Sequence, residues 1–246
     1  MNGVACSRMV AMNSPLNAIG SMATRHVLAE LLRDFEVHSA QPVHLESVGG
    51  VDAARRVQDG ETFDVVLLAA DAIDKLLAHG AAVGAGVAGS RVDIVRSPMA
   101  VAVASHAGQA APDIATEAAL LTAVLAAPSL AYSTGPSGSH LLRLFERWGV
   151  LQAVQPRLVQ APPGVPVAAL VARGDATLGF QQLSELLGQP GVQVLGELPP
   201  GADFITTFSG ALCRTGTRPD AARQLLAFLA APRTAATKQR HGMQPA

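Results

Sequence analysis

Hydroxyl side chains and glycines gather in the segment AYSTGPSGSHLLRLFERWGV, residues 131–150, directly before a helical pattern. Hydroxyl oxygens before a helix cap it by accepting hydrogen bonds from the N–H groups of its first turn. Alternatively, the same N–H groups stay free and bind an anion. This loop alone leaves both interpretations open. Its small residues are Ser133, Thr134, Gly135, Ser137, Gly138 and Ser139.

Three further loops of similar composition precede helical patterns. Ser21 lies in AIGSMATRHVLAEL, Gly49 and Gly50 lie in ESVGGVDAARRV, and Pro163 and Gly164 lie in QAPPGVPVAALV. In an open parallel sheet such turns lie at the carboxyl ends of the strands, where ligands bind. Several helix starts then converge, each with partial positive charge and N–H donors. The four loops together predict a site for a small anion.

Apolar runs alternate with helical patterns along the chain. Apolar spacing in TRHVLAELLRDFE predicts a helix, and the continuous run FDVVLLA predicts a strand buried on both faces. This alternation predicts an α/β fold in which a mainly parallel sheet is flanked by helices. Strands are predicted at 42–48, 63–69, 99–105, 129–133 and 203–213, and helices at 24–36, 52–60, 72–80, 116–127 and 140–149.

Composition excludes several classes of ligand. The formal net charge is −1 and aromatic residues make up 4% of the 246 residues, which argues against nucleic acid as a partner. The chain has neither a GxGxxG fingerprint nor a Walker A loop, so nucleotide binding is disfavoured. It has no CxxC and no Cys/His cluster, so we expect no metal and no cofactor.

The location of the protein and the state of its two cysteines stay open in the sequence. No run reaches the length of a membrane span, so we expect no membrane-spanning segment. The first residues lack the charged and apolar regions of a secretory signal, which predicts a cytoplasmic protein unless the start is truncated or misplaced. Cys6 and Cys213 either form a disulfide or are two unrelated thiols.

The chain from residue 16 to 246 resembles the periplasmic solute-binding proteins of the molybdate type. The resemblance rests on the Ser21 loop and on four segments, ARRVQDGETFDVVLLAADAIDKL, GPSG…LLRLFERWGV, ALVARGDATLGFQQLSELL and ARQLLAFLAAPRTAATKQRHG. It implies a periplasmic small-anion receptor that works with an ABC permease. It also implies two α/β lobes, 1–98 plus 208–246 and 99–207, joined by the crossing strands SPMAVAV and ITTFSGA.

The chain departs from this family at its anion ligands. Molybdate binders carry paired serines in the second loop, where this chain has Gly49 and Gly50, and a tyrosine where it has Gln182. Ser21 is retained. Glycines clear space and let backbone N–H groups approach a ligand. These differences predict a ligand larger than a tetrahedral oxyanion, such as a small carboxylate.

The resulting candidates define two hypotheses about function. Arg96 either pairs with a ligand carboxylate or is a solvated arginine. The alternative to a receptor is an isomerase of a small polycarboxylate, like the aconitate isomerase among relatives of this fold, with His140 or His26 as the base. Both histidines also fit a surface position. The predicted ligand-binding residues are Ser21, Met22, Gly49, Gly50, Arg96, Ser97, Ser133, Gly135, Pro136, Ser137, Gly138, Val165 and Gln182.

Overall fold

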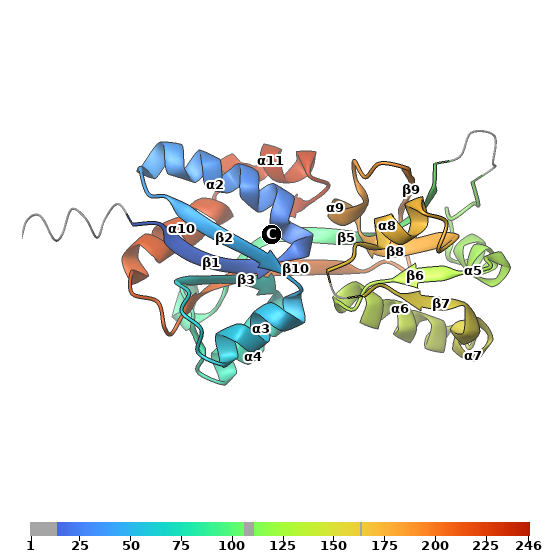
Figure 1. The fold of residues 1–246 in the computed structure, drawn as a ribbon, viewed down its shortest axis with the longest axis horizontal. Helices are drawn as coiled ribbons and strands as arrows, with labels where there is room; N and C mark the ends of the chain where they lie inside the picture. Colours follow the sequence, from blue (N-terminus) through green and yellow to red (C-terminus); the bar gives the residue numbers. More distant parts are fainter. Residues whose placement is uncertain (1–13, 106–110, 163) are drawn as a thin grey trace, which may run out of the picture. The chain divides into compact units, whose positions relative to one another are not determined.

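The computed structural model describes residues 14–105, 111–162 and 164–246, and the chain folds as an α/β protein (Figure 1). It divides into two compact units. Unit 2 is Arg96–Thr206, and unit 1 combines the chain up to Val95 with Thr207–Ala246. Two long strands, β5 (Val92–Ala104) and β10 (Ile205–Cys213), carry the chain from one unit to the other.

Three parallel strands form the centre of unit 1. Strand β1 pairs with β2 on one side and with β3 on the other, and β10 runs antiparallel to β3. Ser21 at the end of β1 is opposite Val48 at the end of β2, and Gly20 is opposite Leu67 in β3. The carboxyl ends of all three strands therefore meet at one edge. The strands of unit 1 other than β5 and β10 are β1 (Leu16–Ser21), β2 (Val43–Val48), β3 (Val65–Ala69), β4 (Ala82–Val83) and β11 (Gln244–Pro245).

Helices cover both faces of this sheet because alternate residues of the strands point to opposite sides. Val65 and Leu67 pack with α2 and α10, whereas Val66 and Leu68 pack with α3 and α4. The predicted apolar face of the first helix is confirmed, since Val27, Leu28, Leu31, Leu32 and Phe35 are all buried. The helices of unit 1 are η1 (Met22–Thr24), α2 (Arg25–Ser39), α3 (Gly50–Gln58), α4 (Ala70–Ala78), η2 (Val87–Gly89), α10 (Pro219–Ala230), η4 (Pro232–Thr234) and α11 (Ala235–Arg240).

Unit 2 has the same plan around the parallel strands β7, β6 and β8. Strand β5 runs antiparallel to β8, with Met99 opposite Gln182, and β9 also pairs with β5. Its strands besides β5 are β6 (Leu130–Tyr132), β7 (Leu158–Gln160), β8 (Leu178–Gln182) and β9 (Val192–Glu197). Its helices are α5 (Glu117–Ala126), α6 (Pro136–Arg147), α7 (Leu151–Val154), η3 (Gln155–Arg157), α8 (Val167–Ala172) and α9 (Leu183–Leu186).

The α/β alternation predicted from the sequence is confirmed, with two differences in the strands. The sheet is mixed rather than mainly parallel because β5 and β10 run against their neighbours. Strand β5 begins at Val92 instead of residue 99, since one strand has to serve both units. Across the described ranges, no helix combines the length and the apolar character that a membrane span requires.

The buried carboxylate of Asp64 joins the early and late parts of unit 1. Its Oδ2 accepts hydrogen bonds from the backbone N–H of Asn17 and from the guanidinium of Arg218, both at 2.9 Å, and its Oδ1 accepts from the N–H of Thr217. The Asp64 backbone also donates to Asn17 and accepts from Cys213. These contacts link β1, β3 and β10 at the amino ends of the parallel strands.

Lys238 lies on the inward face of α11, and only 1% of its surface is exposed. Burial lowers the pKa of its ammonium group from 10.5 to about 8. No described residue donates to or accepts from its side chain, or forms an ion pair with it. Desolvation of this ammonium group destabilises the folded state while the group is charged.

We predict that Lys238→Met stabilises the protein at pH 7, by about 2 kcal/mol, because methionine fills a similar volume without a charge. Between pH 8 and 10.5 the unfolded chain binds the lysine proton more tightly than the folded chain does, so wild-type stability rises with pH and the difference shrinks. Urea unfolding at pH 7 and pH 10 measures both effects. Lys75→Met, at an exposed position on α4, is the matched control. A destabilised Lys238→Met variant would show that the ammonium has a favourable partner.

Candidate functional site

Three helices of unit 1 begin where the parallel strands end. Ser21 closes β1 and caps η1, Gly49 and Gly50 lead from β2 into α3, and Ala69 and Ala70 lead from β3 into α4. Because these strands are adjacent and parallel, the three helix starts share one edge of the sheet. The first N–H groups of a helix have no partner inside it.

The starts of α3 and α4 have no capping side chain. Gly49 and Ala69, which occupy their N-cap positions, cannot accept hydrogen bonds through a side chain, and no side-chain cap is formed there. N–H groups at such a start attract anions through their hydrogen bonds and through the dipole of the helix. The edge of unit 1 therefore offers two sets of backbone donors beside Ser21.

The Ser21 hydroxyl is a helix cap whose own proton is unused. Its Oγ accepts a hydrogen bond from the N–H of Ala23 at 3.3 Å, so it is a helix cap. It is also 9% exposed, and no described residue accepts its proton. A Cβ added to Gly50 would lie 3.9 Å from this Oγ, so the hydroxyl lies beside the first residue of α3. Ser21 is thus a cap that keeps a free donor next to the uncapped start of α3.

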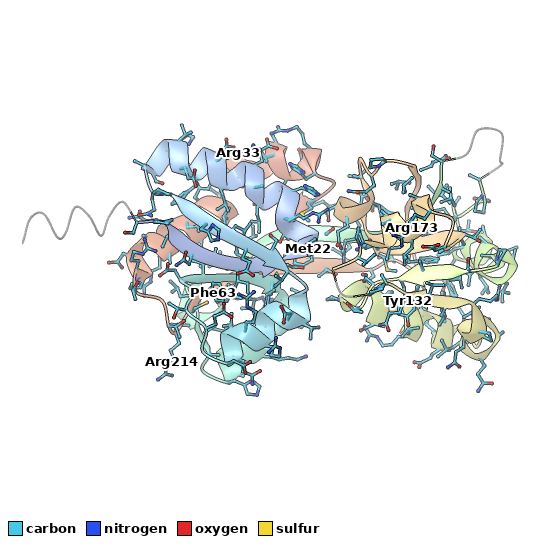
Figure 2. The ribbon with its side chains drawn as sticks, viewed as in Figure 1. Met22, Arg33, Phe63, Tyr132, Arg173 and Arg214 are labelled. Atoms are coloured by element: carbon cyan, nitrogen blue, oxygen red, sulfur yellow. The ribbon has the colours of Figure 1, made fainter. Side chains whose placement is uncertain are left out.

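The loop of residues 133–138 in unit 2 is not a side-chain cap. The hydroxyls of Ser133 and Ser137 bond to each other at 2.9 Å, and Gly135, the N-cap of α6, contributes no side chain. Pro136 occupies the first helical position, where its missing N–H costs nothing. The loop follows Tyr132, the last residue of β6, which is labelled in Figure 2. No side chain caps α6, so the N–H groups of its first turn remain available as donors to an anion.

Gln181 and Gln182 have different partners because successive strand residues point to opposite faces. The Gln181 Oε1 accepts from the N–H of Val167 at 3.0 Å, and so caps α8. The Gln182 amide is saturated, since its oxygen accepts from Thr206 at 2.6 Å and its nitrogen donates to the Ser97 carbonyl at 2.9 Å. Gln182, predicted as a ligand-binding residue, therefore clamps β8 to β5 and β10 in this structure. Val165 is half-buried just before α8.

Arg96 and Ser97 lie at the edge of unit 2 that holds the ends of its parallel strands. Strand β5 is antiparallel to β8, so its first residues in unit 2 lie beside the carboxyl end of β8. Ser97 is fully buried, and its Oγ is 3.4 Å from that of Ser184 in α9. Arg96 is exposed.

Neither candidate base lies free at a helix start. His140, in the second turn of α6, stacks on Phe204 with ring centroids 4.2 Å apart, and burial lowers its pKa below 6.5. His26 is exposed on α2, and its Nε2 accepts from the Nε of Arg25 at 2.9 Å. Its pKa is lowered by burial and by the charge of Arg25. In both rings these effects favour the neutral form over the charged form.

Three groups at these edges were missed from the sequence. Ala69 and Ala70 join a strand to a helix without any loop residue, so no glycine or hydroxyl marks the turn. Gln181 directly precedes Gln182, which was the predicted residue. The two roles differ only because the side chains lie on opposite faces of the strand. Arg25 reads as an ordinary first residue of a helix. The one signal for Arg25 in the sequence was its position, four residues after Ser21.

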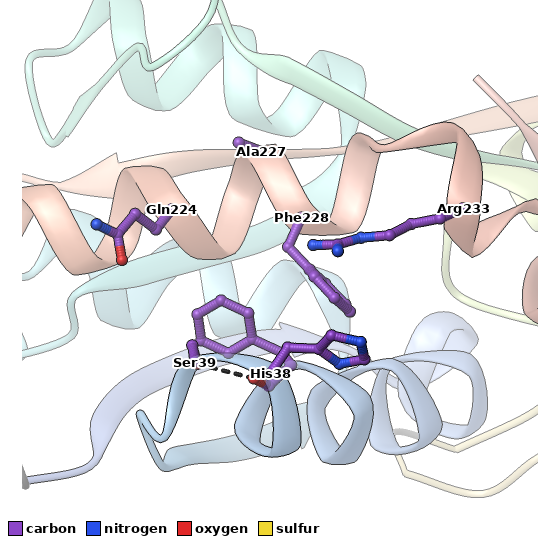
Figure 3. A pocket seen from close by; sticks show the side chains of 7 residues that line it. His38, Ser39, Gln224, Ala227, Phe228 and Arg233 are labelled. Carbon is purple, nitrogen blue, oxygen red and sulfur yellow. Dashed lines mark hydrogen bonds between the residues drawn. The ribbon is translucent and has the colours of Figure 1, made fainter.

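A depression of about 440 Å³ in unit 1 lies away from the helix starts (Figure 3). It is formed by the last turn of α2 and by α10, with the Arg233 guanidinium 4.5 Å from the centre of the Phe228 ring. Its lining residues are Phe35, His38, Ser39, Gln224, Ala227, Phe228 and Arg233. It contains none of the residues predicted to bind a ligand.

The described part of the chain contains one cysteine and no cluster of metal-ligating side chains. Within residues 14–105, 111–162 and 164–246, no three His, Cys, Asp or Glu side chains are grouped so that they could hold a metal ion. Cys213 is a buried free thiol, and burial raises its pKa to about 12. Cys6, its possible disulfide partner, lies outside the described residues.

The fold is that of the periplasmic binding proteins. It matches the molybdate-binding protein of Azotobacter vinelandii with a TM-score of 0.75 at 18% identity, over 93% of this chain and 98% of that one. It matches the sulfate-binding protein of Mycobacterium tuberculosis H37Rv with a TM-score of 0.76 at 15% identity, over 94% and 87%. The predicted fold class is confirmed.

The chain belongs to the bacterial extracellular solute-binding proteins, whose family model matches residues 16–244. This confirms the resemblance to solute-binding proteins seen in the sequence. A curated relative, the aconitate isomerase of a Pseudomonas species, is 39% identical over 191 residues, which are 77% of this chain and 70% of the relative.

We predict that Gly138→Ala destabilises unit 2 by more than about 2 kcal/mol, as expected when a side chain is forced into a packed position. A Cβ at Gly138 would lie 1.8 Å from the Ser133 carbonyl oxygen, whereas one at Gly135 would lie 3.8 Å from the Ser133 Oγ. Gly135→Ala is therefore the control, with a loss below about 1 kcal/mol. Urea unfolding of both variants tests this, and equal stabilities would refute the close approach.

Proposed function

We propose that this solute-binding protein takes a small carboxylate anion as its ligand and that the helix starts of unit 1 bind it. The observation that carries the proposal is the pair of uncapped starts of α3 and α4 beside the Ser21 hydroxyl. These groups supply several backbone donors, and the first turns of α3 and α4 also carry one acidic residue each, Asp52 and Asp71. Hydrogen bonds from preorganised donors to a charged acceptor are about twice as strong as neutral ones.

The glycines at the start of α3 favour a carboxylate over a tetrahedral oxyanion. Gly49 and Gly50 contribute backbone donors and no hydroxyl, so the edge has more room and fewer side-chain donors than paired serines would provide. The similarity to an aconitate isomerase supports the same ligand class, because aconitate is a tricarboxylate. A planar carboxylate also presents two oxygens that accept hydrogen bonds from the N–H groups at a helix start.

Membership of the family supports a role as a receptor. We infer that the protein works outside the cytoplasmic membrane and delivers its ligand to an ABC permease, as the family name and the molybdenum transporter component among its structural neighbours suggest. The edge of unit 2, with the Ser133–Ser137 pair and the uncapped start of α6, carries a second set of donors for anionic groups.

An isomerase is the second candidate, and the relative at 39% identity is the observation that favours it. An allylic proton shift needs a base that removes and returns a proton, together with donors that stabilise the charge developing on the carboxylate. Burial lowers the pKa of His140, which favours its neutral form but makes it a weaker base, and its ring is stacked on Phe204 with Nε2 3.4 Å from the Ala202 carbonyl. The receptor hypothesis therefore comes first.

We predict that carboxylates stabilise the protein in a thermal-shift screen that includes citrate, trans-aconitate, sulfate and molybdate. A ligand at 100 times its dissociation constant adds about 2.7 kcal/mol to the free energy of unfolding. Ser21→Ala should weaken binding by about tenfold, the effect of one hydrogen bond to a charged group. Gly50→Ser is the companion variant, because its Cβ fits at 3.9 Å from the Ser21 Oγ and its hydroxyl should shift the preference toward molybdate. If none of the four anions raises the unfolding temperature, the proposal is refuted.

We predict that the protein binds aconitate without isomerising it. Incubation with cis-aconitate in D₂O, followed by proton NMR, detects both the trans isomer and exchange at the allylic carbon. Neither signal should appear at protein concentrations that saturate binding. Turnover that disappears in His140→Ala, while ligand binding persists, would establish the isomerase hypothesis instead.

A further inference from the structure

Arg25 is an arginine at a helix start that has no acidic partner. It is the first residue of α2 and is half-buried. Its Nε donates to the Nε2 of His26 at 2.9 Å, and its Nη1 lies 4.0 Å from the Sδ of Met22. Within the described chain, no carboxylate pairs with it. Its contacts are thus one neutral ring and one thioether.

Among the described residues, the other half-buried arginines of unit 1 each pair with a carboxylate, whereas the exposed Arg33, Arg214 and Arg233, like Arg25, do not. Arg56 pairs with Glu46 at 2.5 Å, Arg91 pairs with Asp74 at 2.7 Å, and Arg218 pairs with Asp64 at 2.9 Å. A cation at a helix start is also unfavourable, because the helix dipole already makes that end positive. Neither η1 nor the first turn of α2 contains an acidic residue that would compensate. Within the described chain, the positive charge at this point is therefore not balanced by a carboxylate.

The packing of α2 on β2 places Arg25 beside the start of α3. Glu36, on α2, accepts a hydrogen bond from the N–H of Val43, the first residue of β2, at 2.9 Å. Arg25 precedes Glu36 by 11 residues, about three helical turns, so both lie on the same side of α2 and about 16 Å apart along it. Strand β2 covers about the same length between Val43 and Val48. Since α2 and β2 are antiparallel neighbours, Arg25 lies level with Val48, which immediately precedes Gly49 and Gly50.

We propose that Arg25 is a ligand-binding residue that pairs with a carboxylate group of the anion beside the Ser21 hydroxyl and the start of α3. This inference rests on the proposed function and deepens it. The planar guanidinium matches a carboxylate through two parallel hydrogen bonds. His26 is a positioning residue, because its ring occupies the Nε of Arg25 and leaves Nη2, together with Nη1 and its weak Met22 contact, for the ligand. This arrangement also explains why a histidine follows Arg25 without acting as a base.

Isothermal titration with trans-aconitate tests this inference in the full-length protein. Arg25→Gln should weaken binding at least about 30-fold, whereas Arg25→Lys, which keeps the charge but loses the fork, should weaken it less. Arg33→Gln is the matched control. Arg33 lies on the exposed side of α2 about two turns further along, and Figure 2 labels it away from Met22. Its substitution should leave the affinity within about twofold of wild type.

The outcomes separate the inference from the proposed function. Wild-type binding that survives in Arg25→Gln would overturn the role of Arg25 and leave the carboxylate site standing. No wild-type binding of trans-aconitate or citrate would overturn both. Thermal unfolding accompanies the titrations, and we expect unchanged midpoints because Arg25 has no ion pair within unit 1. If Arg25→Gln unfolds earlier, Arg25→Lys decides, since it must bind trans-aconitate at least about fivefold more tightly than Arg25→Gln.

Discussion

Unit 1 depends on the carboxylate of Asp64, where two distant parts of the chain are joined. Asp64 is buried and accepts from the backbone of Asn17 and Thr217 and from the guanidinium of Arg218. A buried carboxylate is stable only if its oxygens are hydrogen-bonded and its charge is paired, and both conditions are met here. Removing one partner of such a pair costs about 3 to 5 kcal/mol, because it leaves a buried charge. The strands that carry the candidate site are therefore held from their opposite end.

The position of the candidate site follows from this anchoring. With the amino ends of β1 and β3 tied together, the parallel register brings Ser21, Gly50 and Ala70 to one edge. Backbone donors at such an edge accept almost any anion, so the few side chains present determine which anion is preferred. In unit 1 those side chains include Ser21, with an unused proton, and the aspartates in the first turns of α3 and α4, and we propose that Arg25 joins them. In unit 2 they are two serines that bond to each other.

The sequence predicted the loops better than the side chains within them. Glycine and hydroxyl residues mark a strand-to-helix turn wherever the turn needs a loop. The sequence therefore predicted the sheet edges around Ser21, Gly50 and Gly135. Ala69 and Ala70 were missed because a strand that passes directly into a helix has no such mark. Roles that depend on packing were also hidden, since Gln181 and Gln182 differ only in the face of β8 on which they lie. Arg25 became interpretable only through the register of α2 on β2.

The order of segments in unit 1 has a consequence for its synthesis. Unit 2 is one continuous stretch, Arg96–Thr206, whereas β10, α10 and α11 of unit 1 are translated after it. A nascent chain emerging from the ribosome can therefore complete unit 2 while β3 still lacks its neighbour β10 and Asp64 lacks Arg218. During that interval the apolar edge of β3 and the inner face of α2 are exposed. Unit 1 closes last, by contacts that span about 150 residues of chain, and such long-range closure is intrinsically slow.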